Sequence, residues 1–280
     1  MNSFSRRDLL KNFAAGAAGA AAMSLLPRGL AARQEGDAAY GGFKMGIQTY
    51  SLRNFDLDKA LDITKDLGLK FAQAYPGKHL PISQDKTQIE VYKEKFKSRG
   101  ITLVSWGVVG MTKNHDKNKE YFEFAKAMGM PVLVADPAPD SFDSLSSLVK
   151  EYGVKIAIHN HGPKHRYDKH TDVLKAVERY PVEIGACVDT GHYIRSGEDA
   201  GKVIRALGPR VHDCHLKDAL DPKTFTVLGK GKIDVLDTLR ALKEVKFTGI
   251  LALEYEEKPQ DPIADIKECL AATREAAKKL

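Results

Sequence analysis

Cysteine and tryptophan are scarce in this chain of 280 residues, which contains three cysteines and one tryptophan. The cysteines are odd in number and form no C-x-x-C pair, so neither a disulfide framework nor a zinc-finger site is indicated. No G-x-G-x-x-G motif follows the first apolar run, which argues against a dinucleotide-binding domain. Long hydrophobic runs are also missing, although a membrane-spanning helix needs about 20 strongly apolar residues. The sequence therefore predicts no stable membrane anchor.

The excess of positive charge is concentrated at the start of the chain. The formal net charge is +6 and the pI is about 9.0, but residues 1–33 contain five basic residues and only one acidic residue. The rest of the chain is nearly neutral, whereas a protein that binds nucleic acid carries a basic patch or stripe. We therefore expect no nucleic-acid partner.

Residues 1–33 are predicted to be an export signal rather than a part of the fold. A basic start is followed by an Ala- and Gly-rich apolar stretch from Phe13 to Leu26 and then by small residues, which is the pattern of a signal peptide. The segment SRRDLLK, from Ser5 to Lys11, resembles the twin-arginine signal, whose pattern is S-R-R-x-apolar-Leu-Lys. This resemblance implies that the protein is exported in folded form to the periplasm.

From residue 43 onward, short apolar runs alternate with amphipathic stretches. The runs are apolar almost throughout, as is typical of parallel strands that are buried on both faces. They cover residues 44–51, 69–75, 101–107, 131–137, 154–161, 182–192, 210–218 and 249–256. The clearest helical patterns cover residues 56–68, 87–100 and 235–249. A glycine follows a basic last turn at several junctions, which predicts helix C-caps at Gly68, Gly100, Gly129, Gly153 and Gly249.

Eight strand–helix units predict an α/β fold, a single-domain (β/α)8 TIM barrel over residues 43–280. A doubly wound open sheet is the alternative, but its glycine-rich motif is missing. In a TIM barrel the functional groups lie at the carboxyl ends of the strands. Polar residues gather at those ends in this sequence, while the first halves of the runs are mostly apolar. We therefore expect one functional site at that mouth of the barrel.

Four successive strand ends offer metal ligands, namely His159, Asp189, His215 and Glu254. Neighbouring strands lie about 4.8 Å apart, so inward side chains from adjacent strands can meet at one point. Two imidazoles and two carboxylates suit one divalent metal ion, such as Mn²⁺, Zn²⁺, Co²⁺, Fe²⁺ or Mg²⁺. Taken singly, Asp189 is also a candidate helix N-cap and each histidine a candidate structural residue. Glu254 is harder to explain in this way, because an apolar strand rarely accepts an unpaired carboxylate.

The segments CVDTGH, HLKD, LGKGKID and GILALEYE give the chain a family resemblance. In order and spacing they resemble the xylose isomerase-like TIM-barrel superfamily of sugar (phosphate) isomerases and epimerases, which also includes inosose dehydratases and endonuclease IV. The resemblance spans residues 43–278 and implies that the four strand-end residues bind the metal. The chain departs from the family at the fifth strand, where His159 in IAIHNH replaces a glutamate.

The resemblance implies acid–base chemistry at a carbon beside a carbonyl group, with a metal that polarises oxygens. Because His159 replaces one of two acid–base glutamates, Glu254 is the only ligand carboxylate left as a catalytic base. The second proton carrier is expected among Lys217, His161 and His192, and His192 also resembles the family's substrate-contacting histidine. A nearby cation can lower the pKa of Lys217 for proton transfer, or Lys217 holds a substrate oxygen.

Several residues are predicted to contact a small-molecule sugar substrate. Lys230 lies between two glycines in LGKGKID, although this segment is equally a turn before a helix capped by Asp234. Trp106 can stack on a sugar face or lie in the core. The full set of predicted substrate contacts is Gln48, Trp106, His161, His192, Lys217 and Lys230.

Three functions remain as alternatives. The first is proton abstraction from a sugar by an exported, metal-dependent enzyme, which performs isomerisation, epimerisation or β-elimination (lyase or hydrolase chemistry) on a 3-keto-glycoside. The second is cleavage of abasic DNA, which is disfavoured by the near-neutral body and by Gln73, which stands where a carboxylate is expected. The third is a non-catalytic periplasmic barrel that binds a sugar.

Overall fold

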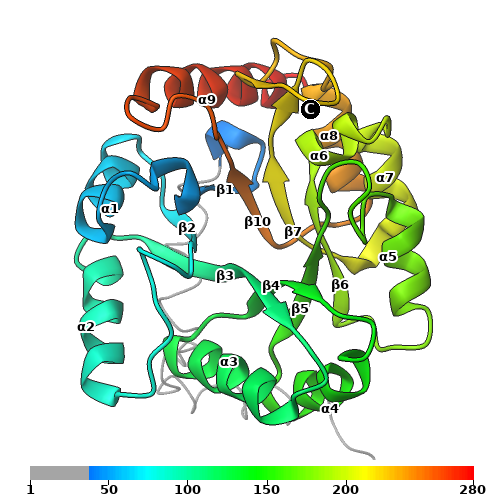
Figure 1. The fold of residues 1–280 in the computed structure, drawn as a ribbon. Helices are drawn as coiled ribbons and strands as arrows, with labels where there is room; N and C mark the ends of the chain where they lie inside the picture. Colours follow the sequence, from blue (N-terminus) through cyan, green and yellow to red (C-terminus); the bar gives the residue numbers. More distant parts are fainter. Residues whose placement is uncertain (1–37) are drawn as a thin grey trace, which may run out of the picture. The chain divides into compact units, whose positions relative to one another are not determined.

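Eight parallel strands close into a barrel in the computed structural model, which describes residues 38–280. Strands consecutive in the chain pair with one another, and the last of them, β10, pairs with β1 to close the barrel. Figure 1 shows the helices arranged outside the ring of strands. The barrel strands are β1 (Lys44–Gln48), β2 (Phe71–Ala74), β3 (Thr102–Met111), β4 (Val132–Pro137), β5 (Lys155–His159), β6 (Ile184–Asp189), β7 (Val211–Leu216) and β10 (Ile250–Leu253).

Each strand is followed by at least one helix, so the predicted (β/α)8 TIM barrel is confirmed. Two helices follow β6. A small hairpin that the sequence analysis did not predict follows β7 and consists of β8 (Asp218–Ala219) and β9 (Phe225–Thr226). The helices are α1 (Leu57–Asp66), α2 (Lys86–Lys97), α3 (His115–Met128), α4 (Phe142–Tyr152), α5 (His170–Val177), α6 (Thr190–Arg195), α7 (Ala200–Leu207), α8 (Val235–Glu244) and α9 (Ile263–Ala277).

Glycines end several helices in the predicted manner. Gly129 and Gly153 take the left-handed conformation at the ends of α3 and α4, with φ of 75° and 65°. The prediction for Gly249 was wrong, because the chain turns earlier, at Lys246, which has φ of 56°. Gly249 is instead a point of close approach between strands, since a Cβ there would lie 2.1 Å from the carbonyl oxygen of His212.

The interior of the barrel is a packed core. Small and apolar side chains fill it below the mouth, including the cluster of Val132, Val134, Ala157 and Cys187. The carboxyl group of Asp213 on β7 is fully buried, and burial raises its pKa to about 6. Because the strands enclose a core rather than a pore, a ligand reaches the site from the mouth.

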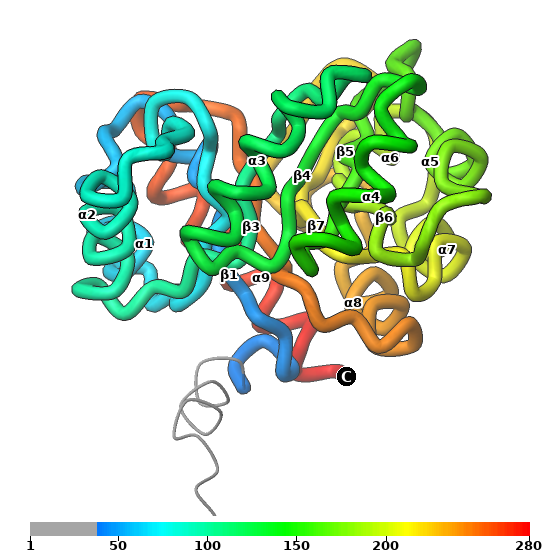
Figure 2. Tube along the Cα trace, turned by 90° about the horizontal axis from the view of Figure 1, so that it is seen from below, coloured from blue at the N-terminus to red at the C-terminus, as the bar shows by residue number. Residues whose placement is uncertain are grey.

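Residues 38–43 and the end of α9 lie together at the amino-terminal end of the barrel strands. Figure 2 shows these two segments side by side. Arg274 donates a hydrogen bond from Nη1 to Tyr40 Oη at 2.8 Å, and its guanidinium lies 5.6 Å from the centre of the tyrosine ring. The first and last turns of the described chain thus cover the end of the barrel opposite the mouth.

Other predictions concern the chain as a whole. The predicted export signal, residues 1–33, lies outside the described residues. Within residues 38–280, no helix has the length and apolar character needed to cross a membrane. Cys187, Cys214 and Cys269 are all buried and form no disulfide among the described residues.

Candidate metal centre and substrate pocket

The four predicted metal ligands meet at the mouth of the barrel. His159 and Asp189 end β5 and β6, His215 lies near the end of β7, and Glu254 follows β10. Their donor atoms all lie within 4.8 Å of one another. All four residues are buried, and the most exposed of them, Glu254, is only 8% exposed. The fold therefore converges four polar side chains on one point.

The spacing of the donor atoms matches the coordination shell of a single cation. His159 Nε2 lies 3.1 Å from His215 Nδ1 and 3.5 Å from Asp189 Oδ2. His215 Nδ1 lies 3.3 Å from Glu254 Oε2 and 3.7 Å from Asp189 Oδ2. Ligand bonds of about 2.0–2.2 Å in tetrahedral geometry place donor atoms about 3.3–3.6 Å apart. Asp189 Oδ2 is buried without a hydrogen-bond partner among the described residues, as expected of an oxygen that serves a cation.

Asp189 is held in place by hydrogen bonds on both sides. Its backbone N–H donates to Asn160 Oδ1 at 2.8 Å, and its carbonyl oxygen accepts from Asn160 Nδ2 at 3.0 Å. Its Oδ1 accepts the backbone N–H of His192 at 2.8 Å, as the N-cap of α6. The N-cap and ligand interpretations of Asp189 are therefore compatible, because one oxygen caps the helix and the other faces the donor atoms. The sequence analysis missed Asn160, whose position directly after His159 was the available signal.

The ring of His215 is oriented from behind by two glutamines. His215 Nε2 lies at short hydrogen-bond distance from Gln73 Oε1, which also accepts from Gln48 Nε2 at 2.6 Å. An amide oxygen only accepts, so Nε2 of His215 carries a proton and donates it to Gln73, which leaves Nδ1 as the nitrogen that faces the other proposed ligands. Gln48 Nε2 also donates to the carbonyl oxygen of Gly107 at 3.1 Å. Gln48, predicted as a substrate contact, thus lines the pocket while its amide supports Gln73, whose role the sequence analysis missed.

Lys217 links three carboxylates beside the centre. Its Nζ lies 3.0 Å from Glu254 Oε2 and 3.5 Å from Asp189 Oδ2, and it forms an ion pair with Glu256. The side chain is 2% exposed, with Nζ 4.1 Å from the centre of the Phe225 ring. Burial lowers the pKa of Lys217, but the three carboxylates outweigh burial and raise it. The lowered pKa that the sequence analysis considered is not found, and the group is an ammonium ion at neutral pH.

The surrounding charges keep the ligand carboxylates ionised. Burial raises the pKa of Glu254, but Lys217 and His215 outweigh burial and hold this pKa below its ordinary value. The pKa of Asp189 is likewise held well below its ordinary value, because Lys217 and a neighbouring imidazole outweigh burial. Burial lowers the pKa of His159 and so favours its neutral form. The centre thus offers anionic oxygens and imidazole nitrogen to a divalent cation.

A pocket of about 390 Å³ lies over the centre. His159 and Glu254 form part of its lining, together with the aromatic rings of Tyr50, Tyr75 and Phe225. Aromatic walls with a few polar groups and this volume suit a small polar molecule such as a monosaccharide. The pocket therefore gives such a molecule direct access to two of the four proposed ligands.

Two predicted substrate contacts, His161 and His192, line the pocket. Burial lowers the pKa of His161 to about 3 and that of His192 to about 2, so both are neutral near pH 7. Arg195 Nη1 lies 3.2 Å from His192 Nδ1. Because a guanidinium only donates, Nδ1 of His192 accepts and Nε2 carries the proton. Arg195 also lines the pocket and was not predicted from the sequence.

Trp106 and Lys230 do not reach the pocket. Trp106 is 1% exposed, and its Nε1 donates to the carbonyl oxygen of Leu80 at 2.8 Å. Its ring packs in the core against Tyr121 and Phe124 rather than toward the mouth. Lys230 is exposed and forms an ion pair with Glu268 at 2.6 Å. Trp106 is therefore a core residue, and Lys230 lies in the turn before α8.

The LGKGKID segment is folded around one carboxylate. Asp218 is 1% exposed, and its two oxygens accept four backbone N–H groups of this segment at 2.8–3.0 Å, from Gly229, Gly231, Lys232 and Ile233. A Cβ at Gly231 would lie 2.3 Å from Asp218 Oδ1, so only glycine allows this approach. Asp234 caps α8 as predicted. The glycines of the segment therefore allow the loop to fold around Asp218, and they are not explained by contact with a substrate.

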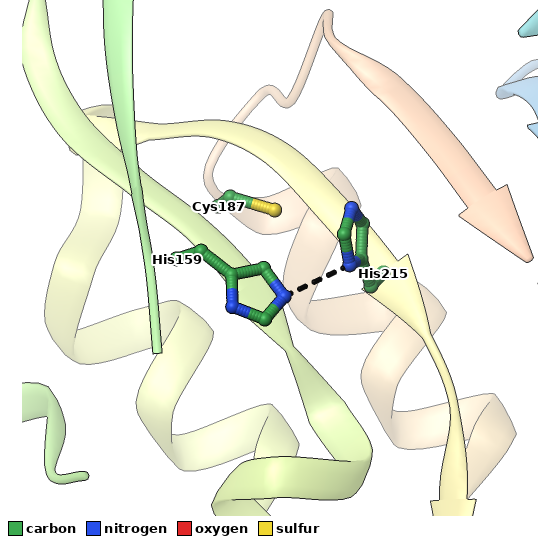
Figure 3. Close-up of side chains that lie close together, drawn as sticks. All are labelled: His159, Cys187 and His215. Atoms are coloured by element: carbon green, nitrogen blue, oxygen red, sulfur yellow. Dashed lines mark hydrogen bonds between the residues drawn. The ribbon is translucent and has the colours of Figure 1, made fainter. Parts of the chain in front are cut away.

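A second group of donor atoms overlaps the first. Cys187 offers a sulfur within 4.8 Å of ligand nitrogens of His159 and His215, and Figure 3 shows the thiol beside both imidazoles. Cys187 pairs in register with His159 and precedes Asp189 by two residues on β6, so it lies deeper in the barrel. Burial raises the pKa of Cys187 to about 12, so the uncoordinated group is a neutral thiol.

Comparisons with known proteins agree with this fold. Residues 61–276 match the family model described as xylose isomerase-like TIM barrel. The chain is 26% identical to an inosose dehydratase of Clostridium perfringens over 223 residues, which are 61% of this chain and 75% of that protein. It is 22% identical to an inosose isomerase of Bacillus velezensis over 239 residues, which are 73% of this chain and 85% of that protein. Matches to other inosose dehydratases cover only 45–46% of their lengths.

A solved structure supports the architecture independently. The crystal structure of the IolI protein, described as binding a zinc atom, superposes with a TM-score of 0.70. The match covers 85% of this chain and 99% of that chain at 18% sequence identity. At this level of identity the likeness concerns the fold.

Proposed function

The chain belongs to the xylose isomerase-like TIM barrel family, and we propose that it is a divalent-metal-dependent enzyme that removes a proton beside the carbonyl group of a free or keto sugar. One observation carries the proposal. The donor atoms of His159, Asp189, His215 and Glu254 have the spacing of one coordination shell, directly under a pocket of monosaccharide size. The similarity to an inosose dehydratase and an inosose isomerase supports a sugar-like substrate.

The charge state of each side chain indicates its role in the proposed reaction. His159, Asp189, His215 and Glu254 would hold a divalent ion, which would supply Lewis acidity toward a substrate oxygen. Glu254 is the base, because its carboxylate is ionised and lines the pocket. Lys217 is a positioning residue. Its ammonium group donates a hydrogen bond to the Glu254 carboxylate and lies against the Phe225 ring. His192 donates its Nε2–H to a substrate oxygen, and the neutral ring of His161 lies beside it.

A single carboxylate base also favours a second candidate, elimination from a 3-keto-glycoside. Glu254 is the one proposed ligand carboxylate among the residues that line the pocket, to which His159 contributes an imidazole. Elimination needs one base for the proton and a donor for the leaving oxygen, whereas epimerisation needs proton carriers on both faces of one carbon. Glu254 and the Nε2–H of His192 satisfy the requirements of elimination.

Hydrogen exchange tests the proposal and separates the two reactions. The purified protein is loaded in turn with Mn²⁺, Co²⁺ and Zn²⁺ and incubated in D₂O with D-fructose, an inosose and a 3-keto-glucoside. We expect deuterium at the carbon beside the carbonyl group of at least one probe, and release of the aglycone from the 3-keto-glucoside if elimination occurs. Chelation should abolish the exchange, and added metal should restore it.

Two variants distinguish an enzyme from a sugar-binding barrel. Glu254→Gln should reduce exchange by at least about 10²-fold, because the base is lost. Glu257→Gln changes an exposed carboxylate outside the pocket lining and should leave exchange unchanged. The proposal fails if the protein binds none of the three metals, or if Glu254→Gln exchanges deuterium as fast as the wild type.

A further inference from the structure

Two alternative sets of ligands share the imidazoles of His159 and His215. The upper set adds the oxygens of Asp189 and Glu254, and the lower set adds the sulfur of Cys187. Figure 3 shows the lower set, in which the thiol and the two imidazoles come from three neighbouring strands of the barrel. A cation near the two nitrogens therefore has oxygen donors on one side and a sulfur donor on the other.

The two positions differ in depth. Glu254 and His159 line the pocket, whereas Cys187 is fully buried and packs with Val132, Val134 and Ala157 inside the barrel. A shift of the cation toward the sulfur therefore moves it away from Glu254 and from the pocket. Asp189 Oδ2 has no hydrogen-bond partner among the described residues and lies 3.5 and 3.7 Å from the imidazole nitrogens. It belongs to the upper set only, since the lower set consists of Cys187 and the two imidazoles.

The donor atoms differ in the ions they prefer. Carboxylate oxygens favour ions such as Mg²⁺ and Mn²⁺, and thiolates favour soft ions. We infer that Cys187 forms a second, deeper metal position with His159 and His215, which captures thiophilic divalent ions such as Cd²⁺ and withdraws them from the substrate pocket. The inference rests on the proposed metal centre. It adds that the chemical type of the ion determines whether the ion occupies the upper position, beside the substrate pocket, or the lower one.

Capture of the ion involves the loss of one proton. The neutral thiol of Cys187 and a divalent ion give a metal–thiolate bond, and the thiol proton is released to solvent. No electron is transferred, because neither the sulfur nor the metal changes its oxidation state. Binding of Cd²⁺ at the lower position should therefore release the proton of the Cys187 thiol, which binding of Mn²⁺ at the upper position leaves on the sulfur.

Titrations with Mn²⁺ and Cd²⁺ test the inference. Metal is first removed from the wild-type protein with a chelator, and the metal-free protein is then titrated with each ion. Proton release and the ultraviolet absorption of the sulfur-to-cadmium charge-transfer band are recorded during each titration. We expect this absorption with Cd²⁺ and none with Mn²⁺. Loss of a second-shell partner already weakens metal binding by about 10- to 100-fold, so Cys187→Ala should weaken Cd²⁺ binding by at least about 10-fold. The affinity for Mn²⁺ should be unchanged in this variant.

Cys214→Ala is the matched control, because Cys214 is equally buried on the adjacent strand β7 but belongs to neither ligand set. It should retain both the absorption and the affinity for Cd²⁺. The inference is overturned if the wild type binds Mn²⁺ but shows no thiolate absorption with Cd²⁺, or if Cys187→Ala binds Cd²⁺ as tightly as the wild type. If the wild type binds neither ion, the proposed metal centre itself is refuted. The presence or absence of thiolate absorption in the wild type with Cd²⁺ tests the inference even if a variant folds poorly.

Discussion

Lys217 Nζ lies 3.0 Å from Glu254 Oε2, and both side chains are buried. Asp189 and Glu256 share the same ammonium group. A lysine with three acidic partners keeps its proton, so it is not a base near neutral pH. Its contribution is to hold the Glu254 carboxylate and to reduce the repulsion between that carboxylate and Asp189.

Substitution of Lys217 tests this positioning role. Lys217→Met leaves buried carboxylates unpaired, which should cost about 3–5 kcal/mol of unfolding free energy. The pKa of Glu254 should rise without the ammonium, so the acidic limb of the pH profile for deuterium exchange should move to higher pH. Lys217→Arg retains the charge and should restore the limb toward its original position. An acidic limb that stays in place in Lys217→Met would contradict the assignment.

Two histidines at the end of β5 should differ in what their loss affects. His159→Ala removes a proposed ligand and should weaken Mn²⁺ binding by at least about 10-fold, as judged from the effect of second-shell changes. His161→Ala changes a residue of the pocket lining two positions later and should raise KM while Mn²⁺ affinity is retained. Metal titration and steady-state exchange rates on both variants check this. Equal Mn²⁺ affinity in His159→Ala and the wild type would refute the ligand role.

Asp218 should contribute to stability rather than to catalysis. Asp218→Asn replaces one acceptor oxygen by an NH₂ group that faces two backbone N–H groups, which should cost about 2–4 kcal/mol of unfolding free energy. Asp221→Asn is the control, because Asp221 accepts two backbone N–H groups in an exposed turn. Urea unfolding measures both changes. A loss of stability in Asp218→Asn no larger than that in Asp221→Asn would count against this role.

We propose that residues 1–33 direct export through the twin-arginine pathway. Replacement of Arg6 and Arg7 by lysine retains the charge but removes the arginine pair on which the motif depends. The double variant should remain in the cytoplasm at its full length, while the wild type appears in the periplasmic fraction of a bacterial host as a shorter product. Arg28→Lys, which lies within residues 1–33 but outside the motif, serves as the control. Immunoblots of the fractions check this, and equal periplasmic amounts of the two proteins would exclude the pathway.

The strands and the four proposed ligands could be predicted from hydrophobic patterns. A strand buried on both faces is apolar along its length, so the polar residue that ends it stands out. His159, Asp189, His215 and Glu254 were all found in this way, as polar residues at four successive strand ends. These inferences needed only local periodicity and the rule that barrel sites lie at strand ends.

The supporting residues could not be found in the same way. Gln73 contacts His215 across 142 positions of the sequence, and Asn160 contacts Asp189 across 29. The first contact depends on the closure of the barrel and the second on the pairing of β5 with β6, and no local pattern encodes either of them. Phe225 covers Lys217 from a short hairpin in a polar stretch without strand periodicity. Trp106 was ambiguous for the opposite reason, because an aromatic ring at a strand end suits the core and a sugar equally well.

The pairing of β10 with β1 also determines at which stage of protein synthesis the proposed metal centre can form. Gln73 comes from the second strand of the barrel, His215 from the seventh, and Glu254 follows the last. A growing polypeptide that has not yet reached residue 254 already contains both imidazoles but lacks the final carboxylate and the seam that brings the ends of the sheet together. During synthesis, the proposed four-ligand centre is therefore completed only after residue 254 has left the ribosome, and a product terminated before that residue lacks one of the four proposed ligands.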